Sequence, residues 1–151
     1  LATLGAQALR DLLARLHQTP VIGTPQAATG ACYAQQLTRA ETWLDWRSPA
    51  ETLERRIRAF NPWPLARSRL GDMDYLIRRA RAKPSCTSAD PGMVLAAQDG
   101  LIQVQTGNGA LELLELQRPG GKALDTQAFL HGHPIKPGSM FTTRGADHAQ
   151  R

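Results

Sequence analysis

The sequence has 151 residues, of which 42% are hydrophobic and 21% are charged. This composition suits a packed core and excludes wholesale disorder. The formal charge of +5 favours an anionic partner such as nucleic acid, although a solvated basic face fits the charge equally well. The two cysteines, Cys32 and Cys86, form neither a disulfide framework nor a metal-binding spacing, and they fit a reduced, cytosolic compartment. No apolar run is long enough to span a membrane.

The first 18 residues carry leucines at helical spacing, and Pro20 disfavours helix in the residue before it, so a helix is predicted over residues 1–18. A face this apolar predicts a packing partner, either the following domain or a domain outside this chain. We therefore expect the isolated chain to self-associate. Since the sequence does not begin with Met or with a signal peptide, we expect a processed chain or a fragment of a longer one. Residues 20–42 are small, polar and turn-rich, which predicts a linker.

A second helix is predicted to begin at Ser48 and to end before Pro62. Ser48 and Glu51 have the spacing of a capping box, and Pro49 suits the first helical position. The expected buried stripe of this helix consists of Ala50, Leu53, Ile57 and Phe60.

Beyond Pro64 the hydrophobic period changes to that of strands. Strands are predicted at residues 65–70, 73–81, 92–97, 101–106 and 111–117, with turns at Gly71-Asp72, Asp99-Gly100 and Asn108-Gly109. Short strands with turns at regular intervals indicate a small antiparallel barrel. A short helix is predicted at residues 124–130 with Asp125 as its cap, followed after Phe141 by a frayed tail.

Catalytic or metal-binding patterns are weak in this sequence. His131 and His133 have no partner ligands at a suitable spacing, so they are interpreted as loop histidines. Gly120-Gly121-Lys122 resembles the end of a phosphate loop, but the first glycine is missing and Ala123 stands where a hydroxyl residue would hold magnesium. Lys122 either meets a phosphate or lies in an ordinary surface turn.

Arginines are the more informative residues. Arg55 and Arg58 are neighbours on one helix, and five more arginines lie on the first predicted hairpin. Such a group can bind the phosphates of an RNA backbone through bidentate hydrogen bonds. For any single arginine, a solvated face with local pairs such as Glu51 with Arg55 remains the simpler interpretation. The tryptophans, Trp43, Trp46 and Trp63, are expected to pack against the barrel rather than to stack on bases.

The run Phe60-Asn61-Pro62-Trp63-Pro64 resembles the C-terminal region of methionyl-tRNA formyltransferases. The resemblance continues in order at residues 91–95, 100–109, 116–122 and 133–138, and it covers nearly the whole chain up to Phe141. The chain departs from the family pattern at Gln35 and Gln36, where the family often carries lysines, and at Ala123, which replaces the second lysine of a G-K-K turn.

The resemblance implies a mainly β fold with helices, namely a small antiparallel OB-like barrel preceded by an N-terminal helix and a linker. Residues 1–19 would be the last helix of a truncated catalytic domain, 20–42 the linker, 43–141 the OB-like tRNA-binding domain and 142–151 a flexible tail. The complete cytoplasmic enzyme would formylate methionine on initiator tRNA from 10-formyltetrahydrofolate. The partners implied are initiator tRNA and the absent N-terminal catalytic domain, with no membrane.

No catalytic, cofactor-binding or metal-binding residue is expected in this chain, so the chain alone is predicted to be inactive. Its expected role is to hold the tRNA acceptor end in line with a distant active site. The residues expected to contact tRNA phosphates are Arg39, Arg55, Arg58, Arg78 and Lys122. Two alternatives stay open, the C-terminal domain of a sugar-amine formyltransferase and a stand-alone RNA-binding module.

Overall fold

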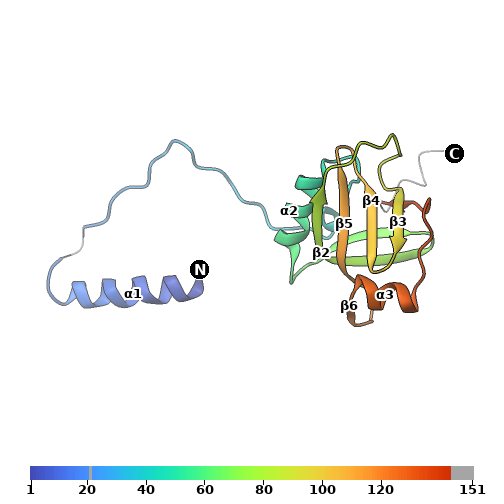
Figure 1. The fold of residues 1–151 in the computed structure, drawn as a ribbon. Coiled ribbons are helices and arrows are strands. Elements are labelled where there is room, and N and C mark those ends of the chain that lie inside the picture. Colours follow the sequence, from blue (N-terminus) through green and yellow to red (C-terminus); the bar gives the residue numbers. More distant parts are fainter. Residues whose placement is uncertain (21, 144–151) are drawn as a thin grey trace. The chain divides into compact units, whose positions relative to one another are not determined.

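The computed structural model describes residues 1–20 and 22–143, and the chain divides into two compact units, Leu1–Gln36 and Leu37–Arg151. The first unit contains helix α1 (Ala2–Leu16), followed by extended chain (Figure 1). The predicted first helix is therefore confirmed, with its end at Leu16. None of its residues is buried within this unit, so its leucine face is exposed to solvent.

The second unit is a curled antiparallel sheet with the strand order β3-β4-β5-β2-β1-β7, and β6 pairs with β5. The strands are β1 (Ala66–Leu70), β2 (Met73–Lys83), β3 (Val94–Gln98), β4 (Leu101–Gln105), β5 (Ala110–Gln117), β6 (Ala123–Asp125) and β7 (Phe141–Thr142). An antiparallel bridge between Met93 and Met140 joins the beginning of β3 to the segment that enters β7, which closes the curve. The predicted OB-like barrel is confirmed.

The three turns that join the predicted hairpins are confirmed, because β1 pairs with β2, β3 with β4, and β4 with β5. Asp99 and Gly100 both have positive φ angles, 51° and 77°, as a two-residue turn of the type I′ class requires. Two short strands were not predicted: β6 has three residues and β7 has two. Neither is long enough to show an alternating pattern in the sequence.

Three helical segments accompany the barrel: the 3₁₀ helix η1 (Ala40–Thr42), α2 (Ala50–Phe60) and α3 (Thr126–Gly132). Helix α2 lies beside β2, and α3 lies at the end of the barrel near β6 (Figure 1). The predicted buried stripe of α2 is confirmed. The cap of α3 is also confirmed, since Asp125 accepts a hydrogen bond of 2.8 Å from the N–H of Ala128.

The capping box predicted at Ser48 is wrong. Pro49 is the N-cap residue of α2, and no side chain caps the helix. Instead, the first helical N–H, that of Ala50, donates to the backbone carbonyl of Asn108 at 3.0 Å. The turn between β4 and β5 thus satisfies a group that a serine hydroxyl was expected to satisfy.

Aliphatic side chains fill most of the barrel, and an aromatic group packs at one side. The indole N–H of Trp46 donates to the hydroxyl of Ser68 at 2.8 Å inside the core, and its ring lies 5.5 Å from that of Phe141. Packing was thus predicted correctly for Trp46. It was predicted wrongly for Trp63, which is 75% exposed.

The tail predicted at residues 142–151 falls mostly outside the described residues. Its first two residues belong to the barrel, because Thr142 lies in β7 and the hydroxyl of Thr143 donates to the carbonyl of Leu44 at 2.6 Å. The C-terminal end of the described chain therefore holds the segment that leads into α2.

Candidate nucleic-acid interface

A cleft of about 270 Å³ lies between α2 and β2, and arginine is the most frequent residue in its lining. Helix α2 contributes Arg58, and β2 contributes Arg78, Arg79 and Arg81. The packing that fixes this geometry is the apolar stripe of α2, which lies against the sheet. Two of the predicted contacts, Arg58 and Arg78, are thus brought together, and two hairpin arginines join them.

A bulge in β2 explains how adjacent arginines reach one cleft. Side chains of successive residues in a regular strand point to opposite faces. The pairing of β2 with β5 shifts register between Ile77 and Arg79 and again between Arg79 and Ala80. Such an irregularity re-aims side chains, so Arg78 and Arg79 both line the cleft.

The single carboxylate that lines the cleft, Glu54, is already engaged. One oxygen of Glu54 accepts a hydrogen bond of 2.9 Å from the backbone N–H of Ala82. Asn61, at the end of α2, donates from its side chain to the carbonyl of Arg78 at 3.1 Å. Both contacts tie α2 to β2, and the surplus of arginines makes the cleft positive.

The four arginines of the cleft differ in what they already contact. Arg78 is half-buried, forms a 3.2 Å ion pair with Glu115 and donates to the side-chain oxygen of Gln117 at 3.1 Å. Within residues 1–20 and 22–143, no carboxylate pairs with Arg58, Arg79 or Arg81, and Arg58, Arg79 and Arg81 are exposed. The free guanidinium groups are therefore those of Arg58, Arg79 and Arg81.

The other predicted contacts do not line this cleft. Arg55 is exposed on α2 and donates to the hydroxyl of Thr52 at 3.2 Å rather than pairing with Glu51. Arg39 precedes η1, where its carbonyl accepts from the hydroxyl of Thr42 at 2.7 Å and its side chain is exposed.

Lys122 belongs to a second cleft at the turn between β5 and β6. This cleft is lined by Arg118, the two glycines before Lys122, Phe129 and His133, among other residues. The ring of His133 packs edge-on against Phe129 at 5.2 Å. His131, interpreted from the sequence as a loop histidine, instead lies in α3. The second cleft is also basic, but it is lined by fewer positively charged residues than the arginine cleft.

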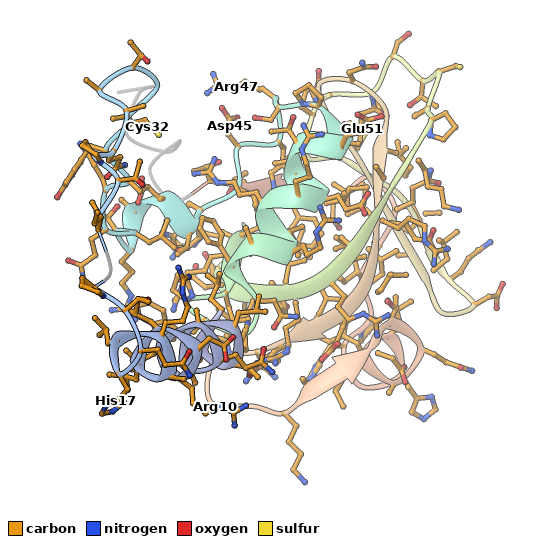
Figure 2. All side chains as sticks on the ribbon, turned by 90° about the vertical axis from the view of Figure 1, so that its left-hand side faces the viewer. Arg10, His17, Cys32, Asp45, Arg47 and Glu51 are labelled. Carbon is orange, nitrogen blue, oxygen red and sulfur yellow. The ribbon has the colours of Figure 1, made fainter. Side chains whose placement is uncertain are left out.

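Charged side chains hold the segment that leads into α2. Arg56 donates to the backbone carbonyl of Glu41 at 2.7 Å. Arg47 and Asp45 form a two-pronged ion pair, with contacts of 2.9 and 3.0 Å, just before α2; Figure 2 shows them together, with Glu51 in the first turn of α2. The hydrogen bonds from Arg47 hold the pKa of the Asp45 carboxyl below its ordinary value, and the same pair raises the pKa of Arg47.

Comparison with known proteins assigns the family. The model of the formyl transferase C-terminal domain matches residues 36–134, well over half of the chain. This chain belongs to the formyl transferase C-terminal domain family. The resemblance read from the Phe60-Asn61-Pro62-Trp63-Pro64 run is thereby confirmed.

Relatives of this formyl transferase domain carry the name methionyl-tRNA formyltransferase. The relative from Nitrosococcus oceani is 42% identical over 142 residues, covering 93% of this chain and 44% of that protein. The relative from Ralstonia nicotianae is 40% identical over 146 residues, covering 95% of this chain and 45% of that protein. The chain thus spans less than half the length of these relatives.

A solved structure confirms the fold of this formyl transferase domain. HypX from Aquifex aeolicus, crystallised in complex with tetrahydrofolic acid, matches with a TM-score of 0.64 at 20% identity, over 87% of this chain and 24% of that one. In the part of the chain that the structure describes, no helix is long and apolar enough to cross a membrane. Nor do those residues bring together three or more potential metal ligands.

Proposed function

We propose that this domain binds initiator tRNA and positions its acceptor end for a methionyl-tRNA formyltransferase, which transfers formyl from 10-formyltetrahydrofolate to the methionine amino group. The observation that carries the proposal is the cleft between α2 and β2, where three exposed arginines have no carboxylate partner among the described residues. The names of the relatives support the choice of tRNA among RNA ligands.

The proposed mechanism is electrostatic. Arg58, Arg79 and Arg81 would bind phosphates through forked N–H groups, each replacing counterions on the RNA. Arg78 would act mainly by orienting its neighbours, since Glu115 and Gln117 already hold its guanidinium. Lys122 and Arg39 would add contacts outside the cleft. Holding the acceptor end in place lowers the entropic part of the barrier to a reaction that other residues perform.

A salt series with initiator tRNA tests this proposal. Binding to the 151-residue chain should weaken steeply as salt rises, and the slope reports the number of phosphate contacts. The double variant Arg58→Gln with Arg81→Gln should lower the slope by about 0.7 to 0.9 for each lost contact. The double variant Arg10→Gln with Arg15→Gln is the matched control, because it also removes two arginines, from α1, which lies outside the barrel unit.

Equal slopes for the cleft variant and the control would refute the assignment of the cleft. Absence of tRNA binding even at low salt would refute the tRNA-binding role and would favour a small nucleotide-sugar substrate for the complete enzyme. We also propose that the chain alone is inactive, which formyl transfer to charged initiator tRNA in its presence would contradict.

A further inference from the structure

Trp63 is the most exposed tryptophan of the chain that the structure describes, with 75% of its surface open to solvent. A tryptophan usually buries most of its large apolar surface, so an exposed one in a folded domain indicates a binding surface. The contrast within this chain is clear, because Trp46 is only 3% exposed and its indole N–H is bonded inside the core.

The loop that carries Trp63 is held at both ends. Before the tryptophan, the side chain of Asn61 donates to the carbonyl of Arg78 on β2 at 3.1 Å. After it, the N–H of Leu65 donates to the carbonyl of Phe60 at 2.9 Å. Prolines at positions 62 and 64 fix the φ angles on both sides of the tryptophan. The indole is thus presented on an ordered loop.

Leu65 has a positive φ angle of 68°, a conformation that is uncommon for residues other than glycine and costly for a bulky side chain. Local strain of this kind persists only where the surrounding structure holds it, and it is concentrated at binding and catalytic sites. Here it accompanies the tight return of the chain from α2 into β1, which leaves Trp63 at the outside of the loop.

The loop lies next to the arginine cleft. Asn61 lines that cleft together with Arg58 and Arg78. Two residues of chain span at most about 7 Å, so the backbone of Trp63 lies within that distance of a cleft residue. Proteins that bind unpaired nucleotides combine basic side chains, which contact the phosphates, with exposed aromatic rings, on which the bases stack. The arginine cleft and the nearby exposed Trp63 offer both kinds of group.

We propose that Trp63 is a base-stacking residue that receives an unpaired nucleotide of the RNA whose phosphates lie in the arginine cleft. The inference rests on the proposed function, because it takes RNA as the ligand of the cleft. It assigns different roles to the two groups. The arginines bind any RNA backbone, whereas Trp63 selects RNA with an unpaired end over a fully paired duplex. An indole accepts any base, so the selection depends on pairing rather than on sequence.

The test uses the 151-residue chain and two RNA hairpins, one with a short unpaired 3′ end and one with a blunt end. Trp63→Ala should weaken binding of the first hairpin about 5- to 150-fold, which is the loss expected for one base–aromatic stack. It should leave binding of the blunt hairpin nearly unchanged. Trp63→Phe should retain part of the preference, while Trp63→Leu, which keeps apolar surface without a π face, should not.

The salt slope separates this inference from the proposed function. Trp63→Ala removes no charge, so its slope should equal that of the unsubstituted chain. Salt-dependent binding that is equally tight with Trp63→Ala, or equally weakened for both hairpins, would overturn the stacking role alone. A change in oligomeric state without a change in RNA binding would instead identify Trp63 as a protein contact. Failure of both hairpins to bind the unsubstituted chain would overturn both proposals.

Discussion

Gly107→Ala should destabilise the barrel strongly, although the substitution adds only one methyl group. Gly107 lies in the turn between β4 and β5, and its N–H donates to the carbonyls of Trp46 at 2.9 Å and Ser48 at 3.2 Å. A Cβ atom at this position would clash with the carbonyl oxygen of Arg47 and would lie 2.6 Å from its carbonyl carbon. Both atoms belong to the backbone, so no side-chain rotation relieves the contact.

The cost follows from what must move. Relieving the clash separates the turn from residues 46–48, which weakens the hydrogen bonds of Gly107, worth about 1 kcal/mol together. Overpacking in a well-packed region costs about 1 to 3 kcal/mol more. The sum, about 2 to 4 kcal/mol, is a large part of the roughly 5 to 15 kcal/mol that stabilises a domain. The midpoint of thermal unfolding should therefore fall by about 8 to 17 °C.

Thermal and urea unfolding of the two glycine variants measure this effect. Gly132→Ala is the matched control, because a Cβ there meets nothing within 4 Å. It should be neutral or stabilise by a few tenths of a kcal/mol, about the size of the entropy that alanine removes from the unfolded chain. Equal midpoints for Gly107→Ala and Gly132→Ala would refute the argument that close backbone contact holds the turn against the segment before α2.

Two further predictions concern side-chain contacts. Asp125→Ala should lower the free energy of unfolding in urea by about 1 kcal/mol, because it removes the hydrogen bond from the N–H of Ala128. Asp125→Asn should retain most of this stability, since an asparagine side chain also accepts the bond. Equal stability of the two variants and the unsubstituted chain would contradict the cap. Asp45→Asn should reduce the pH dependence of stability. The pKa of Asp45 is lowered in the folded chain by Arg47, so the contribution of this pair is present above the unfolded pKa and is lost as the pH falls through the folded pKa. The difference in unfolding free energy between the two proteins should therefore shrink below about pH 4, and it should be small because the pair is exposed. A constant difference from pH 7 to pH 3 would contradict the assigned cause.

The hairpins could be predicted from the sequence because their signals are local. Each turn is marked by a short pair of turn-forming residues, namely Gly71-Asp72, Asp99-Gly100 and Asn108-Gly109. Apolar and polar residues tend to alternate along the strands beside these turns. The start of α2 could not be predicted in the same way. Its first N–H is bonded by Asn108, which lies 58 residues farther along the chain, so the local serine pattern indicated a cap that a distant carbonyl provides.

The candidate site was predicted in composition but not in arrangement. The sequence shows that β2 is rich in arginine, yet which arginines line a common cleft depends on the bulge around Arg78. A bulge is a feature of pairing between two strands, and no turn residue marks it within β2. For the same reason the sequence could not show that Glu115 and Gln117 hold Arg78. On β2, the cleft arginines without a carboxylate partner in the described chain are therefore Arg79 and Arg81.

Among the described residues, the cleft contains one arginine that is paired with a carboxylate and three that are not, and this difference affects how a basic domain can discriminate between ligands. A guanidinium held by a carboxylate, as in Arg78, already has its charge compensated, so it adds order rather than affinity. An unpaired guanidinium adds affinity for any phosphate, and by itself no selectivity. Selectivity then requires a second kind of contact close to the free charges. In the described barrel that position is occupied by the loop from Asn61 to Leu65, which returns the chain from α2 to β1 and exposes Trp63. One short connection therefore joins α2, which carries Arg58, to β1, and it places an exposed tryptophan two residues along the chain from Asn61, which lines the cleft.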